Sequence, residues 1–293
     1  MLEGVMLLWF ILVGFSLMFV LYDSLTNTPV SWVQKLAWIL VTFYCGPMGL
    51  FFYLLACRNP GPGLHDQFTR AEWKQALNSE MHCLAGDASG IILAAVIVFH
   101  FGLANGVDLI LEYLSAFVVG LLIFHALMMR SMYDNDYAKA VRKNFFAETV
   151  SMNMVMVGMI PVMVTLMHNW QYGDDPLRPQ FWFIMGLATI AGGITAFPIN
   201  AWLVRNKLKH GCMTLPEKGA EVPHQHEHMQ HQQSSKGEMK HEHHSHSEPE
   251  MDDQDHQMGS LDTGKASLIV AATFAALLLA ASLTSMFLAP ITF

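Results

Sequence analysis

The sequence predicts an all-α protein that crosses a membrane about seven times. Of its 293 residues, 53% are hydrophobic and only 14% are charged, whereas soluble domains carry about 25% charged residues. The apolar residues gather in seven long runs, and roughly 17–25 apolar residues are enough for a helix to cross a bilayer. Helices three to six are joined more tightly than the others, and we expect them to form a compact four-helix core.

The first two runs, Leu2–Tyr22 and Trp32–Cys57, are expected to form an N-terminal transmembrane hairpin within residues 1–57. The first run lacks a basic leader and a small-residue cleavage site, so we interpret it as a retained helix rather than a signal peptide. Gly46-Pro47 interrupts the second run and predicts a kink there. Residues 58–78 are polar and are expected to connect this hairpin to the core.

The four-helix core is expected over residues 79–205. Its helices correspond to the runs Ala85–Leu103, Val107–Met129, Thr149–Met167 and Phe181–Val204. Residues 206–264 are polar and poor in aromatic residues, so they cannot bury a core, and we expect a disordered loop. The last run, Ala266–Leu288, predicts a transmembrane helix within residues 265–293.

Lysine and arginine gather in alternate loops, and loops rich in these residues face the cytoplasm. The loops rich in lysine and arginine follow the second, fourth and sixth runs. Lys35, at the edge of the first loop, and Arg178 are exceptions. We therefore expect a multi-pass protein of the bacterial inner membrane. Its N-terminus and the loop 206–264 would lie in the cytoplasm, and its C-terminus outside.

Methionines recur in the fifth run at steps of four, three, four and four. These steps follow the turns of an α-helix, so the side chains fall on one stripe. A thioether is a soft ligand that suits Cu(I), but methionine also fills irregular cores, and packing alone stays an alternative. The stripe comprises Met152, Met156, Met159, Met163 and Met167, with Glu148 before it and His168 after it.

Two neighbouring helices carry further groups that could bind a metal. Imidazoles and carboxylates inside a membrane are costly unless they are paired or coordinate an ion. In the predicted topology they share one depth with the start of the methionine stripe. The alternative is that they lie at the interface or pair with basic residues. They are His82, Cys83 and Asp87 on the third helix, and His125, Met128 and Met129 on the fourth.

Other residues of the core are expected to shape helix contacts rather than to bind an ion. Glycines four residues apart let helices approach closely, buried amides form hydrogen bonds between helices, and prolines free a backbone carbonyl. The residues concerned are Gly86, Gly90, Asn153, Asn200, Pro161 and Pro198.

Histidines and methionines are interleaved in the loop 206–264. In a disordered chain such spacing favours mobile metal capture, with a merely polar spacer as the alternative. Imidazole mixed with thioether favours copper or silver, whereas imidazole with carboxylate equally fits zinc, nickel or cobalt. The capture residues are His224, His226, His228, His231, His241, His243, His244, His246 and His256.

The four core helices resemble a bacterial membrane family known only as domain of unknown function number 4396. The similarity covers about residues 79–213. It implies a multi-pass bundle and a loose tie to copper and heavy-metal handling, without a mechanism. It rests on His82-Cys83-x-x-Gly86-Asp87-x-x-Gly90, on Ser151-Met152-Asn153-x-x-Met156-x-Gly158-Met159-Ile160-Pro161, and on Pro198-x-Asn200-x-Trp202-Leu203-Val204.

Together these patterns predict a membrane protein that binds and translocates a soft metal ion. Cu(I) is the first candidate, and silver, zinc and nickel are others. No Gly-rich phosphate loop is present, which excludes a P-loop ATPase, and no catalytic residue is predicted. A redox protein holding haem, and a non-transporting sensor or docking subunit, stay open as alternatives. Expected partners are a metallochaperone or a second copy of the chain, and no nucleic acid.

Overall fold

The computed structural model describes residues 2–127, 130–209, 211 and 261–293. Over these ranges the chain forms helices and no β-strand, which confirms the predicted fold class. Six helices are long and apolar enough to cross a membrane, one fewer than predicted. They are α1 (Leu2–Thr26), α5 (Glu72–Val98), α6 (Asn105–Phe117) with its π-helical continuation η2 (Val118–Leu127), α7 (Tyr137–Asn169), α8 (Pro179–Arg205) and α9 (Thr263–Phe287).

The second apolar run is not one span but two short helices, α2 (Trp32–Cys45) and α3 (Pro47–Ala56). Gly46 between them has φ +55°, a left-handed conformation that glycine adopts without steric cost. A Cβ on Gly49 would lie 2.7 Å from Thr42 Cα, so α3 folds back closely against α2. At 1.5 Å per residue the two helices are about 21 and 15 Å long, too short to cross a hydrocarbon core of about 30 Å.

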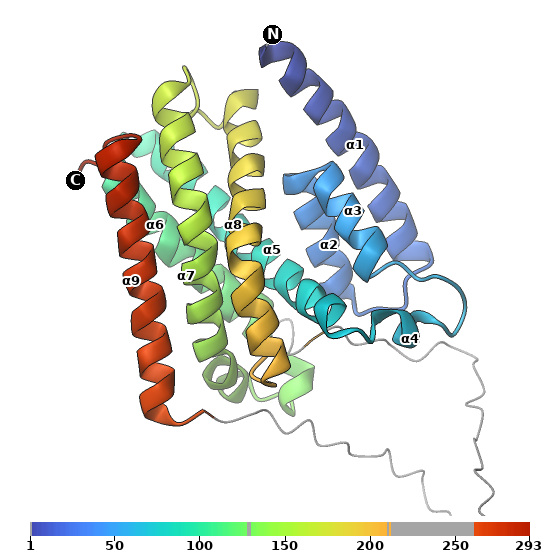
Figure 1. The fold of residues 1–293 in the computed structure, drawn as a ribbon. Coiled ribbons are helices and arrows are strands. Elements are labelled where there is room, and N and C mark those ends of the chain that lie inside the picture. The colour runs from blue at the N-terminus through green and yellow to red at the C-terminus, as the bar shows by residue number, and fades with distance from the viewer. Residues whose placement is uncertain (1, 128–129, 210, 212–260) are drawn as a thin grey trace, which may run out of the picture.

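This back-folded hairpin changes the position of the N-terminus. The two termini lie at the same end of the bundle (Figure 1), whereas the sequence prediction placed them on opposite sides of the membrane. The start of α2 lies beside the start of α5, because Gln34 Nε2 donates a hydrogen bond of 3.2 Å to the Asn78 carbonyl. Lys35, the exception in the loop-charge pattern, therefore shares an end of the bundle with the other basic loops.

The large core cluster is built mainly from α5, α7 and α8, with α9 against α7 and α1–α3 on the other side. The predicted close approach at the two glycines is present. A Cβ on Gly90 would lie 2.6 Å from Ala116 Cα, and one on Gly86 would lie 3.0 Å from Gly120 Cα. Helix α5 can therefore contact α6 and η2 almost backbone to backbone.

Buried amides join the helices as expected. Asn153 accepts a hydrogen bond of 2.8 Å from Tyr113 on α6 and donates one of 3.0 Å to Thr273 on α9. Pro161 does not break α7, which continues to Asn169, and Pro198 lies within the continuous α8. Three short helices complete the described chain: α4 (His65–Thr69), η1 (Phe99–Phe101) and η3 (Arg130–Tyr133).

Candidate metal centre

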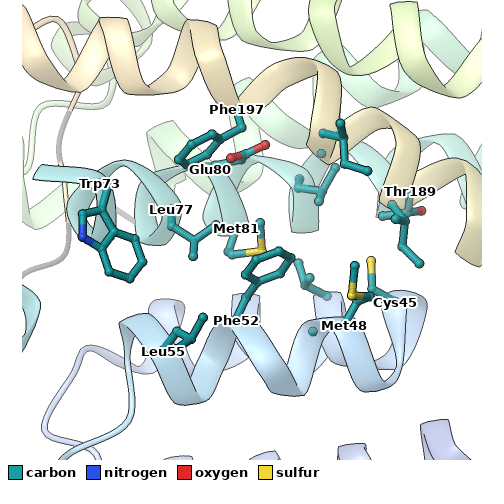
Figure 2. A pocket seen from close by; sticks show the side chains of 16 residues that line it. Cys45, Met48, Phe52, Leu55, Trp73, Leu77, Glu80, Met81, Thr189 and Phe197 are labelled. Carbon is teal, nitrogen blue, oxygen red and sulfur yellow. The ribbon is translucent and has the colours of Figure 1, made fainter.

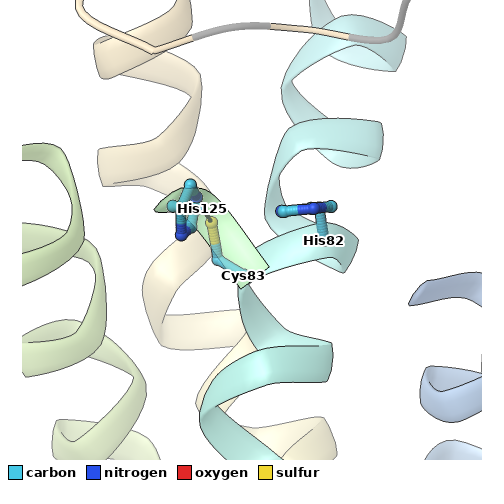
Figure 3. A group of neighbouring side chains, drawn as sticks. All are labelled: His82, Cys83 and His125. Carbon is cyan, nitrogen blue, oxygen red and sulfur yellow. Dashed lines mark hydrogen bonds between the residues drawn. The ribbon is translucent and has the colours of Figure 1, made fainter. Parts of the chain in front are cut away.

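Three metal-ligating side chains meet inside the bundle (Figure 3). His82 and Cys83 are successive residues of α5, and His125 lies on η2. One ligand atom from each can be chosen so that all three lie within 4.8 Å of one another, and all three residues are buried. Since zinc–nitrogen and zinc–sulfur bonds are about 2.0–2.3 Å long, small side-chain rotations would bring these atoms to one ion.

The π-helical turn of η2 determines how His125 is oriented. Its Nδ1 lies 3.0 Å from the carbonyl oxygen of Gly120, five residues earlier. A carbonyl can only accept, so Nδ1 carries the proton and Nε2 presents its lone pair. Cys83 Sγ lies 3.1 Å from that Nε2. A ring N–H held by a backbone carbonyl is the arrangement that orients metal-binding histidines in proteins.

Two carboxyl groups lie directly behind this histidine. Glu148 Oε2 is 3.2 Å from His125 Nδ1, at ion-pair distance but outside hydrogen-bond geometry, because the N–H is aimed at Gly120. A Cβ added to Gly120 would overlap Glu148 and lie 2.6 Å from Asp87 Oδ1. Only glycine therefore lets both carboxyl groups converge on this point of η2.

The centre contains buried polar atoms that lack partners. Within the described residues, His82 Nε2 and all four carboxyl oxygens of Asp87 and Glu148 have no hydrogen bond. Leaving such groups unpaired costs about 1–3 kcal/mol each and more for charged groups. The ring of His82 contacts that of His125 edge to face, with centroids 5.1 Å apart. The cluster therefore has acceptor atoms available for a cation.

Lys209 is an unexpected member of the cluster. It follows the end of α8, yet it is buried and lines a cavity of about 20 Å³ together with His82 and His125. Its Nζ donates to Asn200 Oδ1 and, over 3.3 Å, to Ser151 Oγ. Burial alone lowers the pKa of Lys209, but Cys83, Glu148 and Asp87 raise it, and the result lies above the usual lysine value.

The methionine stripe faces the protein interior. Met152, Met156, Met159 and Met163 are almost completely buried in the core cluster, and Met167 packs against it. Where α7 meets α8, a Cβ on Gly192 would lie 2.8 Å from Met159 Cγ, so this part of the stripe is tightly packed.

The far end of the stripe reaches a second cavity, of about 500 Å³. Met163, Met167 and the exposed His168 line it. Three acidic residues, Asp108, Glu112 and Asp174, lie in the same walls. The stripe thus extends from the level of the metal cluster to an acidic cavity about 22 Å further along α7, at 1.5 Å per residue.

The structure brings together five of the predicted ligands: His82, Cys83, Asp87, His125 and Glu148. His168 lies at the opposite end of α7. Three predictions fall outside the described residues: Met128, Met129 and the loop histidines between 224 and 256.

Sequence reasoning missed Gly120 and Lys209 as members of the site. Gly120 belongs to no sequence motif. Its carbonyl orients His125 only because the chain forms a π-helical turn there. The only available signal for Lys209 was a basic residue close behind an apolar run, which is also typical of an ordinary cytoplasmic loop.

Residues 72–209 match the model of a protein family described as a domain of unknown function (DUF4396). The matched segment contains the whole buried cluster, from His82 to Lys209, and leaves out α1–α3 and α9. No curated protein and no solved structure is detectably similar to the chain.

Proposed function

We propose that this chain, whose residues 72–209 match the model of the DUF4396 family, binds Cu(I) inside the membrane and moves it through the helical bundle. The observation that carries the proposal is the buried meeting of two imidazoles and a thiol at His82, His125 and Cys83. Thiolate and imidazole both suit Cu(I), but imidazole suits zinc as well. The buried methionine stripe that leads away from the cluster favours Cu(I), because a thioether is a soft ligand that suits this ion.

Binding of Cu(I) by Cys83 displaces the thiol proton. The sulfur–hydrogen bond breaks, the sulfur–copper bond forms, and one proton must leave for each ion bound. Asp87 and Glu148 lie beside the cluster with no hydrogen-bond partner for their oxygens among the described residues. Asp87 is suited to accept the proton, so ion binding and proton movement would be coupled.

The methionine stripe offers a route away from this centre. Conduction needs sites weak enough to release the ion, and neutral thioethers bind more weakly than a thiolate. The acidic cavity at the far end adds a negative potential that attracts cations. Its acidic wall residues are Asp108, Glu112 and Asp174.

The basic residues at the other end of the bundle favour a cytoplasmic location for the metal centre. With six spans, the two termini and the acidic cavity would then lie on the outer side of a bacterial inner membrane. Metal capture by the loop histidines belongs to this proposal and would act at the cytoplasmic end.

Competition titration of purified protein with a chromogenic Cu(I) chelator tests the binding. We expect one tightly bound Cu(I) per chain, weakened at least 100-fold by Cys83→Ser or His125→Gln. Cys45→Ser removes another buried thiol and is the matched control. A chain that binds Cu(I) equally well without Cys83 would disprove the proposed site.

Transport needs a separate measurement in sealed vesicles. The triple variant Met152→Leu, Met156→Leu, Met159→Leu keeps the apolar packing but removes three thioethers. We expect it to retain the tight site and to lose most of the copper flux. Unchanged flux would assign the stripe to packing, and binding without any flux would support a sensor or docking subunit.

The haem alternative is disfavoured by the contact between the two histidines. His82 and His125 touch edge to face, which leaves no slot for a macrocycle between them. An absorption spectrum of the purified protein with a Soret band would contradict this argument.

A further inference from the structure

A second site lies outside the metal centre, between the α2–α3 hairpin and helices α5 and α8. It is a cavity of about 380 Å³ (Figure 2). Its volume lies within the roughly 300–1,000 Å³ of small-molecule sites in proteins. Apart from Glu80 and Thr189, its walls are formed by apolar side chains and glycine.

Glu80 is the unusual group in this cavity. Its side chain lies beside Phe197 on the cavity wall (Figure 2). The residue is only 1% exposed, and within the described chain neither of its carboxyl oxygens has a hydrogen-bond partner. A buried carboxyl group without a donor is costly, so an occupant that supplies an N–H donor and a positive charge would be bound preferentially.

The mouth of the cavity opens through apolar side chains. Met48, Leu55 and Ile194 line it and are exposed at the surface, Ile194 by 66%. Because these residues lie on apolar helices of the bundle, the mouth faces the hydrocarbon of the membrane rather than water. An occupant would therefore arrive from the bilayer and must itself be lipophilic.

Aromatic side chains in the cavity wall provide a second feature that attracts a positively charged group. Phe52 and Phe197 lie on the walls, and Trp73 lies at one end (Figure 2). Aromatic faces attract ammonium groups, most strongly where the site is desolvated. A carboxyl group, aromatic faces and an apolar chamber together match a molecule with a charged amine head and a hydrocarbon body.

We propose that this cavity binds a lipophilic amine, with its protonated primary or secondary nitrogen donating to Glu80 and its apolar body filling the space between α3 and α8. The proposal does not depend on metal binding, because Glu80 is not among the clustered ligands of the metal centre.

The test measures equilibrium binding of three probes to the full chain in lipid nanodiscs. Dodecylamine carries charge and N–H donors, dodecyltrimethylammonium carries charge without donors, and dodecanol carries neither charge nor N–H donors. We expect dodecylamine to bind at least tenfold more tightly than either of the others. Glu80→Gln should remove that advantage and leave dodecanol binding unchanged.

Two further variants serve as controls for the amine-binding test. Glu80→Asp retains the carboxyl group on a shorter side chain and should restore part of the preference for the amine, even if the glutamine variant fails to fold. Asp23→Asn alters a buried carboxyl group that lines neither this cavity nor the metal centre and should leave binding of all three probes unchanged. Both variants should bind Cu(I) as the unaltered chain does, which separates this proposal from the metal function.

Three outcomes would overturn the proposal. Equal binding of dodecylamine and dodecanol would show a groove for lipid chains only. Equal binding of the trimethylammonium probe would rule out the hydrogen bond to Glu80. Binding of Ag(I) that is lost in Cys45→Ser or Met81→Leu, with no amine binding, would assign the cavity to a soft metal through its sulfur atoms.

Discussion

Glu148 gives the sharpest test of the proposed metal centre, because it would act behind the ligand His125 rather than as a ligand itself. Its Oε2 lies 3.2 Å from His125 Nδ1, on the side of the ring opposite to Cys83. Glu148→Gln keeps the size of the side chain and removes its negative charge. An ion on Nε2 would lie about 6–7 Å from that charge, which is worth roughly 2–3 kcal/mol at an effective dielectric constant of 20.

That energy sets an upper limit of roughly 100-fold on the change in affinity. Removing such partners of metal-binding histidines typically costs about 10–100-fold. We therefore expect the dissociation constant for Cu(I) to rise within this range while the stoichiometry stays at one. The ring should stay in place, because the Gly120 carbonyl continues to accept the Nδ1 proton at 3.0 Å.

The assay is chelator competition on the purified full chain, with a melting curve to show that the variant is folded. Glu112→Gln is the matched control, because it neutralises a buried carboxyl group far from His125. A folded Glu148→Gln protein whose Cu(I) affinity stays within twofold of the original would refute the reasoning, since His125 could then not be the ligand that Glu148 supports.

Three more predictions concern packing and charge. Gly90→Ala places a methyl group 2.6 Å from Ala116 Cα; it should lower the free energy of unfolding by about 1–3 kcal/mol, whereas Gly14→Ala, with open space around it, should leave the melting curve unchanged. Asn78→Ala removes the acceptor of the Trp38 indole N–H and the donor to the Ala56 carbonyl; protease digestion should cut between α3 and α5 faster, and unchanged cleavage would contradict a role in holding the hairpin. Lys209→Gln removes a positive charge beside the metal ligands and should tighten Cu(I) binding about tenfold; weaker binding in the titration would show that the lysine supports the site instead.

The sequence predicts the depth that His82, His125 and Glu148 share better than it predicts the topology around them. His82, His125 and Glu148 were placed at one depth by the alternating direction of helices three to six. The predicted directions of helices three to six stay the same although the second apolar run does not cross the membrane. Counting that run as a span reverses only the direction of α1. The length and hydropathy of a run cannot reveal that Gly46 adopts a left-handed conformation and lets α3 fold back.

Other features of the site depend on contacts that no local pattern encodes. A π-helical turn at Gly120 needs the neighbouring helices to support it. Glu80 is one residue of a helix that was already rich in polar groups, and only packing shows that it lines a different cavity from His82. The burial of Lys209 requires the chain to turn back over the bundle after α8.

The buried Lys209 has a consequence for how any ion could be handled. The ammonium group of Lys209 already lies beside the Cys83 thiol and the two imidazoles, so the centre contains a positive charge before any ion binds. Under the proposed function, an arriving cation would exchange with the ammonium group of Lys209, which is covalently attached to the protein. On release, the same ammonium group would replace the outgoing ion, which would lower the electrostatic barrier to release. Such a tether would allow a tightly bound ion to leave by exchange.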